Sequence, residues 1–321
     1  MTHRLIQVTV LVLACHGIAL TGQATPGAAN TPNATKEQGS IALLAKSVSD
    51  LNFVAAWRGC QEYASRRQYQ CLLLGPEGSA SPRAQLQALD AAVTTHDIDA
   101  LAVSVTHSAL LAHRLKSLSV PVFTFDSPLS APYQGLSLAY VGMDNRQMGR
   151  ELGYLARQLH PKGGTLCLMS AENDTNLNLR MAGVREVLNR GWTELARCPW
   201  DSGDSVNRAL RQLQTTLTQL QPDVFIAVGH WPVLEPHRLQ AMLTALETNG
   251  ASHHTSLLFA TGHLSEAQLS LLNEGLVDGY VAVDFYQIGR AVAQQMIAYL
   301  AGENPAAPTP VPSRTYTRDR P

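Results

Sequence analysis

Side chains that commonly bind ligands recur immediately after the predicted strands of this 321-residue chain. They are mostly carboxylates, amides, hydroxyls and imidazoles, with two aromatic rings among them. Carboxylates and amides can bind vicinal hydroxyls bidentately, and aromatic faces pack on the C–H faces of a sugar ring. This inventory predicts a site for a small polyhydroxylated ligand. Its members are Ser47, Ser49, Asp50, Asn52, Phe53, Asp126, Ser127, Glu172, Asn173, Asp174, Asn176, Gly229, His230, Trp231, His263 and Asp284.

Short apolar runs that alternate with helical periodicity supply the framework for these side chains. The predicted strands are 40–46, 69–74, 100–105, 121–126 and 139–142, then 165–170, 194–199, 224–228, 256–260 and 279–283. Helical spacing of apolar residues lies between or after the strands. Two successive series predict an α/β fold with two Rossmann-like lobes, each a parallel sheet covered by helices. Because ligands bind beyond the carboxyl ends of such strands, the loops after them should form the site.

Each site residue also has a structural interpretation. Asp50 and Asp284 could simply cap helices, and Phe53 falls at the spacing of a core residue. Trp231 could begin a packed helix. His230 could form an ordinary structural hydrogen bond, and the same holds for His263, Asn173 and Asp174.

Composition excludes several classes of protein. Apolar residues make up 45% of the chain and charged residues 15%, which is enough for a sizeable core and too little charge for a disordered chain. Lys and Arg total 24 against 25 Asp and Glu, for a net charge of -1. A protein that binds nucleic-acid backbones usually carries a basic excess, so this function is disfavoured.

The N-terminus has the order of a secretory signal. Arg4 precedes an apolar stretch over 5–20, and Gly22-Gln23-Ala24 is a candidate cleavage site. We expect a signal peptide at 1–24, a flexible leader at 25–39 and a periplasmic mature chain. A membrane anchor is one alternative, although the run is short for spanning. Lipidation of Cys15 is another, and it fits the sequence less well than cleavage after Ala24.

Four cysteines remain after removal of the signal peptide. No CxxC or Cys/His ligand spacing is present, which argues against a zinc site. Export permits disulfides, and the plausible pairs are Cys60 with Cys71 and Cys167 with Cys198. Four buried free thiols are the alternative, and the sequence leaves both open.

The chain lacks the common catalytic signatures. No GxSxG, HExxH, P-loop or GxGxxG arrangement is present. His230 and His263, with a carboxylate, could be imagined as a metal or acid/base set, but they come from separate loops without diagnostic spacing. We therefore expect a binding protein without enzymatic activity, catalytic residues, metal or cofactor.

Several motifs over about residues 40–318 resemble the ribose-type periplasmic sugar-binding proteins, a LacI-related family of type I periplasmic binding proteins. Each motif is weak alone, but their order and spacing are fairly specific. The resemblance implies ligand-binding roles for Asp50, Phe53, Asp126 and Arg180, although an arginine on a helix is more often a solvated charge. The motifs are Ile41 to Gly59, Val120 to Asp126, Tyr140 to Gly149, Arg180-Met-Ala-Gly183, Asn273-Glu-Gly275 and Gln287-Ile-Gly289.

The resemblance also implies an architecture and a function. Two lobes, 40–140 plus 284–312 and 141–283 plus 313–321, would be joined by three hinge strands, with the last helix returning to the first lobe. A monomer would close on a small sugar and present it to an ABC importer. Alternatively, a periplasmic sensory receptor would signal to a sensor kinase or chemoreceptor. Regulators of the LacI type share the fold but begin with a helix-turn-helix, which residues 1–39 do not resemble.

Three positions depart from the family pattern. Gly229 stands where these proteins usually have a ligand-binding Asn, and His263 where they usually have Asp. Val283 stands where they usually have Gln or a similar polar residue. The polar set of the second lobe is therefore expected to be remodelled, which puts ribose itself in doubt.

Overall fold

The computed structural model describes residues 39–78, 80–171, 174–250, 254–305 and 310–319. The predicted signal peptide, with its alternatives at the N-terminus, and nearly all of the predicted leader lie outside these residues. Glu172 and Asn173 lie outside them too. None of the helices in the described ranges has the length and apolar character needed to cross a bilayer.

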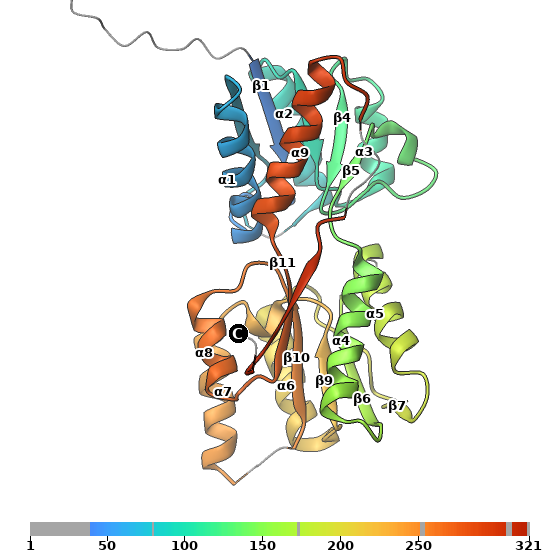
Figure 1. The fold of residues 1–321 in the computed structure, drawn as a ribbon, viewed down its shortest axis with the longest axis vertical. Coiled ribbons are helices and arrows are strands. Elements are labelled where there is room, and N and C mark those ends of the chain that lie inside the picture. The colour runs from blue at the N-terminus through green and yellow to red at the C-terminus, as the bar shows by residue number, and fades with distance from the viewer. Residues whose placement is uncertain (1–38, 79, 172–173, 251–253, 306–309, 320–321) are drawn as a thin grey trace, which may run out of the picture. The chain divides into compact units, whose positions relative to one another are not determined.

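The first lobe is built on a five-stranded parallel sheet in the order β2-β1-β3-β4-β5 (Figure 1). Apolar residues alternate between its two faces. Ile41 and Leu43 pack in one buried cluster with α1 and α9, whereas Ala42 and Leu44 pack in another with α2 and α3. Covering both faces explains the unbroken apolar run of β1. The elements are β1 Gly39–Leu44, α1 Leu51–Ser65, β2 Tyr69–Leu74, α2 Pro82–Thr95, β3 Ala100–Val103, α3 Ser108–Leu115, β4 Val122–Phe125, η1 Gln134–Leu136, β5 Tyr140–Val141 and α9 Phe285–Leu300.

The second lobe has a sheet in the order β12-β11-β10-β9-β6-β7, with β8 beside β6. All its pairings are parallel except that of β12 with β11, which is antiparallel. The elements are α4 Asn145–Leu159, β6 Gly164–Ser170, α5 Thr175–Val187, β7 Trp192–Glu194, β8 Trp200–Asp201, α6 Val206–Thr215, η2 Thr216–Leu220, β9 Val224–Ala227, η3 Trp231–Val233, α7 Pro236–Thr248, β10 Ser256–Thr261, α8 Glu266–Asn273, β11 Gly279–Val283 and β12 Ser313–Thr317.

One predicted strand is wrong. Instead of a strand over 194–199, β7 ends at Glu194 and the chain turns, with the Cys198 N–H donating to the Leu195 carbonyl at 2.9 Å. Pro199 has no N–H to donate to a strand ladder, so continuous pairing through it is disfavoured. Pairing resumes in β8, which contacts β6.

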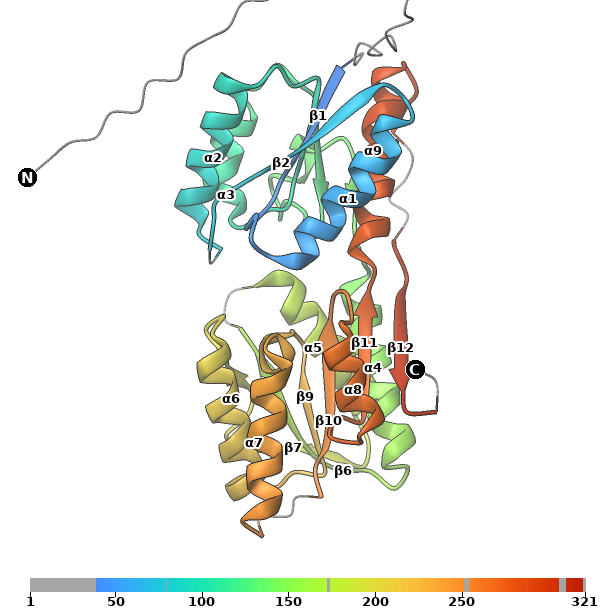
Figure 2. The same cartoon turned by 90° about the vertical axis from the view of Figure 1, so that its left-hand side faces the viewer.

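The chain passes between the lobes three times (Figure 2). The passages run from β5 to α4, from β11 to α9 and from α9 to β12. Helix α9 lies along α1 in the first lobe. Gly59 and Gly289 permit this contact, because a Cβ on either would overlap the carbonyl oxygen of Tyr286 or Ala56. The last helix therefore returns to the first lobe, as the resemblance implied.

Both candidate cysteine pairs are disulfides. Cys60–Cys71 joins α1 to β2 with Cα atoms 6.0 Å apart. Cys167–Cys198 joins β6 to the turn after β7 with Cα atoms 5.4 Å apart. Of the two alternatives that the sequence left open, the structure thus has the paired one.

Candidate functional site

The strand order places a topological switch point in each sheet. In the first sheet, β1 lies between β2 and β3. In the second, β6 lies between β7 and β9. Ligands of open α/β sheets bind beyond the carboxyl ends of the strands at such points. The first switch point carries Lys46 and Ser104, with Asp126 on the next strand. At the second switch point, Asp174 lies in the loop after β6 and His230 in the loop after β9.

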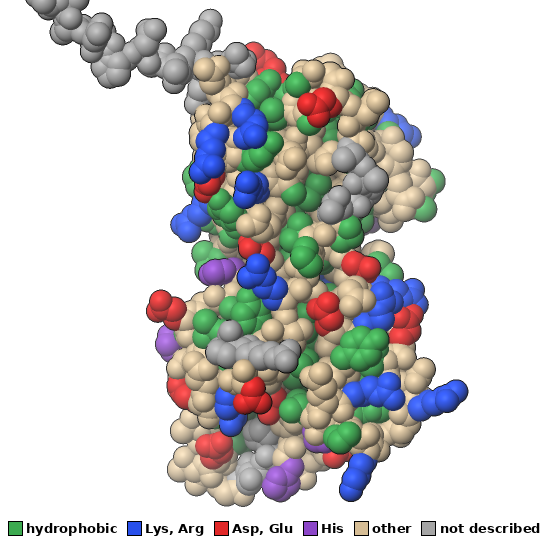
Figure 3. Space-filling view, in the orientation of Figure 1, with side chains coloured by type: hydrophobic (Ala, Val, Ile, Leu, Met, Phe, Trp, Pro, Cys, Tyr) green, Lys and Arg blue, Asp and Glu red, His purple; other side chains and the backbone are tan. Residues whose placement is uncertain are grey.

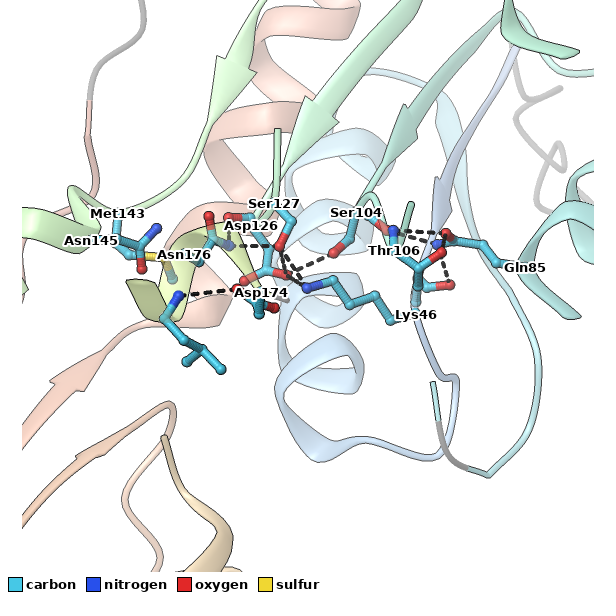
Figure 4. Close-up of polar contacts among 12 residues, drawn as sticks. Lys46, Gln85, Ser104, Thr106, Asp126, Ser127, Met143, Asn145, Asp174 and Asn176 are labelled. Atoms are coloured by element: carbon cyan, nitrogen blue, oxygen red, sulfur yellow. Dashed lines mark hydrogen bonds and ion pairs between the residues drawn. The ribbon is translucent and has the colours of Figure 1, made fainter. Parts of the chain in front are cut away.

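Asp126 is the centre of the first lobe's half of the site (Figure 4). Asp126 is the first residue after β4. Its backbone has a φ of 58°, and the residue is 7% exposed. Its Oδ2 accepts from Ser104 Oγ at 2.7 Å and from Ser127 Oγ at 3.2 Å, and lies 3.4 Å from Lys46 Nζ. Lys46 Nζ also donates to Ser127 Oγ at 2.6 Å. The buried carboxylate is therefore both oriented and charge-compensated.

A buried glutamine supports the two strand tips that carry these groups. Gln85 on α2 donates through Nε2 to the Ala45 carbonyl at 3.1 Å and to the Ser104 carbonyl at 2.7 Å. Its Oε1 accepts from Thr106 Oγ1 at 2.6 Å (Figure 4). These bonds fix β1 and β3 relative to each other, and they position Lys46 and Ser104 in consequence.

Two asparagines contact the opposite lobe. Asn176, near the start of α5, donates through Nδ2 to Ser127 Oγ at 2.7 Å and to the Asp126 carbonyl at 3.3 Å. Asn52, at the start of α1, accepts at Oδ1 from the His263 N–H at 3.3 Å. Gly262 allows this approach, because a Cβ there would overlap the Asn52 amide. Hydrogen bonds therefore join the start of a helix in each lobe to the loop after a strand in the other.

Arg180 is held rather than solvated. Its Nε donates to Asn145 Oδ1 at 2.7 Å and its Nη1 to the Val228 carbonyl at 2.9 Å, and Nη2 lies 3.9 Å from Met143 Sδ. Burial lowers the pKa of the guanidinium, while the nearby carboxylates of Asp126 and others favour the charged form. The interpretation as a freely solvated charge is excluded.

His230 and Trp231 lie at the tip of β9. Burial lowers the pKa of His230, and the charge of Arg180 adds to this effect, while Asp50 opposes it. Trp231 is 6% exposed, and its Nε1 donates to Asp204 Oδ1 at 3.0 Å. Its ring covers Gly229, where a Cβ would lie 2.5 Å from the indole. Glycine at this position is thus explained by the indole that occupies the space of a side chain.

Other predicted site residues have mainly structural contacts. Phe53 is 4% exposed and packs edge-on against Phe125 and Phe285, with ring centroids 6.0 and 5.9 Å away. The Asp50 carboxylate caps α1 by accepting a hydrogen bond from the Asn52 N–H at 2.8 Å. The Asp174 carboxylate caps α5 in the same way, accepting from the Leu177 N–H at 3.0 Å.

Three predicted residues lie apart from the central group. Ser49 is exposed and accepts from the Gly78 N–H at 3.4 Å, and the His263 side chain is exposed. Asp284 caps α9 by accepting from the Gln287 N–H at 3.2 Å, and it lines a cavity of about 490 Å³ with Tyr140 and Pro312 among its walls. The predicted residues that the structure brings together are Asp50, Asp126, Ser127, Asp174, Asn176, Arg180, His230 and Trp231.

The model of the family described as "Periplasmic binding protein domain" matches residues 41–304. The chain belongs to this family. The resemblance read from the motifs is therefore confirmed. None of the curated protein sequences matches the chain.

Solved structures share the fold of this periplasmic binding protein. An ABC transporter solute-binding protein of Burkholderia graminis, solved with D-arabinose, is 18% identical, with a TM-score of 0.76 over 88% of this chain and 96% of that one. One of Agrobacterium vitis, solved with α-D-tagatopyranose, is 18% identical, with a TM-score of 0.75 over 88% and 95%. The glucose-galactose binding protein GanP of Geobacillus stearothermophilus is 17% identical, with a TM-score of 0.74 over 88% and 99%. The predicted type I fold is confirmed.

Sequence reasoning missed several residues of this periplasmic binding protein's site. Lys46 is the first charge after the apolar run of β1, a signal that was present in the sequence. Tyr140 donates its hydroxyl to the Asp126 carbonyl at 2.8 Å, and burial, with the Asp126 charge, raises its pKa. Asp204 and Asn145 gave no signal, because their contacts depend on tertiary structure.

The donors and acceptors at the strand tips are groups that can hydrogen-bond to a ligand. Across the part of the chain that the structure describes, no group of three or more His, Cys, Asp or Glu could hold a metal ion. Ser170, the last residue of β6, has a buried Oγ without a hydrogen-bond partner among the described residues. It adds an uncommitted hydroxyl at the second switch point.

Proposed function

We propose that this chain is a periplasmic solute-binding protein that captures a small sugar or sugar-like polyol between its lobes and presents it to an ABC importer. One observation carries the proposal: charged and polar side chains of both lobes converge at the strand tips, where Asn176 of the second lobe donates to Ser127 Oγ and to the Asp126 carbonyl of the first. Family membership supports it, as do the pentose and hexose complexes among the structural neighbours.

The contacts of Asp126 leave room for a ligand hydroxyl. Its three polar side-chain contacts all fall on Oδ2. Oδ1 has no hydrogen bond among the described residues, so it can accept from a sugar hydroxyl. Lys46, Arg180 and the neutral His230 supply donors around it. Vicinal hydroxyls both donate and accept, and this mixed set satisfies both functions.

Binding would favour closure about the three passages between the lobes. A ligand that completes both halves of the site has a higher affinity for the closed form, so it shifts the population toward closure. We propose that the moving units are 40–140 plus 284–312 and 141–283 plus 313–321. Closure excludes water and raises the penalty for a wrong hydroxyl pattern, because an unpaired polar group is then buried.

An extracytoplasmic location is part of the proposal. Two disulfides are typical of an oxidising compartment and rare in the cytosol. Together with family membership, they support export by the signal peptide proposed at 1–24. Lipidation at Cys15 remains the alternative to cleavage after Ala24.

A thermal-shift screen of the mature chain against pentoses, hexoses and polyols tests the ligand. A molecule that binds only the native state raises the melting temperature by mass action. We expect Asp126→Asn and Arg180→Gln each to lose that shift. The exposed residues Asp97 and Arg211 offer matched controls, and Asp97→Asn and Arg211→Gln should keep it. An equal shift in all four variants would show that the ligand binds elsewhere.

The sensory alternative is favoured by the remodelled second lobe, in which Trp231 covers Gly229. Deletion of the gene in the organism of origin separates the two functions. The importer function predicts loss of uptake of the radiolabelled ligand. Normal uptake with loss of ligand-dependent transcription or chemotaxis would instead establish the receptor function.

A further inference from the structure

Arginines surround a hollow on the outer face of the first lobe, away from the site at the strand tips. The hollow has a volume of about 420 Å³ and lies between α1 and α9, with walls formed by Glu62, Tyr63, Arg66, Arg67 and Arg290. Lys and Arg side chains gather over this helix pair (Figure 3). Because the whole chain has a net charge of only -1, this concentration of cations is a local feature.

The single carboxylate in the walls of the hollow is already engaged. Glu62 accepts from Arg66 Nη2 at 2.8 Å and from the Tyr286 hydroxyl. The latter bond raises the pKa of Tyr286, so the phenol stays a neutral donor. The charge of Glu62 therefore offsets that of Arg66 alone.

The other two arginines carry uncompensated charge. The Arg67 guanidinium lies 3.7 Å from the Tyr63 ring centroid, and its Nη1 donates to the Tyr63 carbonyl at 3.3 Å. Arg290 is exposed, and its side chain has no hydrogen bond or ion pair among the described residues. A guanidinium has five N–H donors, so most donors of the three arginines remain available.

The framework of the hollow is fixed. The close contact between α1 and α9 at Gly59 and Gly289 leaves no room for a Cβ on either glycine. The Cys60–Cys71 disulfide ties α1 to β2 one residue beyond Gly59. The backbone that carries the arginines is therefore held before any ligand arrives, which reduces the ordering cost of binding.

We propose that this hollow binds a phosphate-bearing anion. The planar forks of arginine match phosphate oxygens bidentately. A terminal phosphate offers three strong acceptor oxygens and a phosphodiester two, and either anion can accept from several of the available donors of Arg66, Arg67 and Arg290. The phosphate can belong to a free anion or to a phospholipid headgroup, and the two sources are separable by experiment.

Isothermal titration of the mature protein with inorganic pyrophosphate tests the free anion. We expect binding at low ionic strength that weakens toward roughly 0.15 M salt. Arg67→Gln and Arg290→Gln should each weaken it at least about tenfold, while Arg211→Gln on the second lobe should leave it unchanged. These exposed positions are not expected to affect folding, and the sugar-dependent thermal shift should persist in every variant.

Co-sedimentation with phosphatidylcholine vesicles, with and without phosphatidylglycerol, tests the headgroup. Binding that requires phosphatidylglycerol and is lost in Arg290→Gln supports the site with a lipid source. The proposal is overturned if neither probe binds. It is also overturned if Arg290→Gln binds both as tightly as the wild type.

Discussion

At the tip of the first sheet a buried carboxylate is held by hydroxyls and an ammonium group, whereas at the tip of the second sheet an indole covers the backbone. Asp126 and its partners leave one carboxylate oxygen uncommitted. In the second lobe, Gly229 presents no side chain, and Trp231 fills that space. The strand frameworks are alike, but the side chains at their switch points are not.

This difference separates two requirements of a two-lobed binding protein. The parallel strand order places loops beyond the carboxyl ends of the strands, where ligands of such sheets bind. In the proposed function, the side chains at these tips set the hydroxyl pattern that is accepted. In this chain the first lobe offers charge and hydrogen bonds, and the second offers Arg180, a neutral His230 and a mostly buried indole.

Removing the cation of the first lobe should have the largest effect. Lys46→Met leaves the Asp126 carboxylate buried without its ammonium partner. Loss of one partner of a buried pair costs about 3–5 kcal/mol, and Lys46 is partly exposed, so we expect a loss of about 2–3 kcal/mol of unfolding free energy. Urea unfolding measures it, with the exposed Lys116→Met as control. Adding Asp126→Asn should recover part of the loss, and no recovery would mean that charge is not the cause.

Restoring a side chain at the second lobe's tip should have a smaller but definite effect. Gly229→Asn places a Cβ 2.5 Å from the Trp231 ring. Overpacking of this kind costs about 1–3 kcal/mol. The same substitution in a Trp231→Leu background should cost much less, which a double-mutant cycle of unfolding free energies reveals. Equal losses of unfolding free energy in both backgrounds would show that the indole is not the reason why position 229 requires glycine.

The strands could be predicted from the sequence because they are buried. Strands that are covered on both faces read as continuous apolar runs, and the predicted 69–74 and 279–283 coincide with β2 and β11. The prediction of a strand over 194–199 was wrong, because the strand pairings there are short, lie at an edge of the second sheet and are interrupted by the turn before Pro199. Strand-tip positions such as those of Asp126 and His230 follow from the same parallel order.

The contacts between the side chains of the site were harder to predict from the sequence than the strands were. That Trp231 folds back over Gly229, and that Asn176 reaches Ser127, depends on side-chain direction and on the placement of one lobe against the other. Neither is encoded in local spacing. Phe53 shows the converse, since helical spacing is equally compatible with core and ligand positions, and its ring packs between Phe125 and Phe285.

The neutral imidazole of the second lobe should make stability depend on pH. Burial lowers the folded-state pKa of His230, while histidine in the unfolded chain titrates near 6.5. Below about pH 6.5 the unfolded chain binds a proton that folded His230 resists, so stability falls as the solution is acidified. His230→Gln should reduce the slope of unfolding free energy between about pH 7 and 5.5 by no more than about 1.4 kcal/mol per pH unit. Exposed His237→Gln serves as control, and an unchanged slope in His230→Gln would place the titrating group elsewhere.

The bonds that join the two lobes should have the smallest energetic effect. Asn176→Ala removes the donor to Ser127 Oγ and the Asp126 carbonyl. A net contribution of about 1 kcal/mol corresponds to roughly a fivefold change in the ratio of closed to open molecules. Pulsed dipolar spectroscopy between nitroxide side chains at positions 97 and 211, one on each lobe, would show a larger population at long distance. Asn178→Ala, an exposed position on the same helix, should reproduce the wild-type distribution. If Asn176→Ala reproduces it too, the bonds of Asn176 accompany closure without stabilising it.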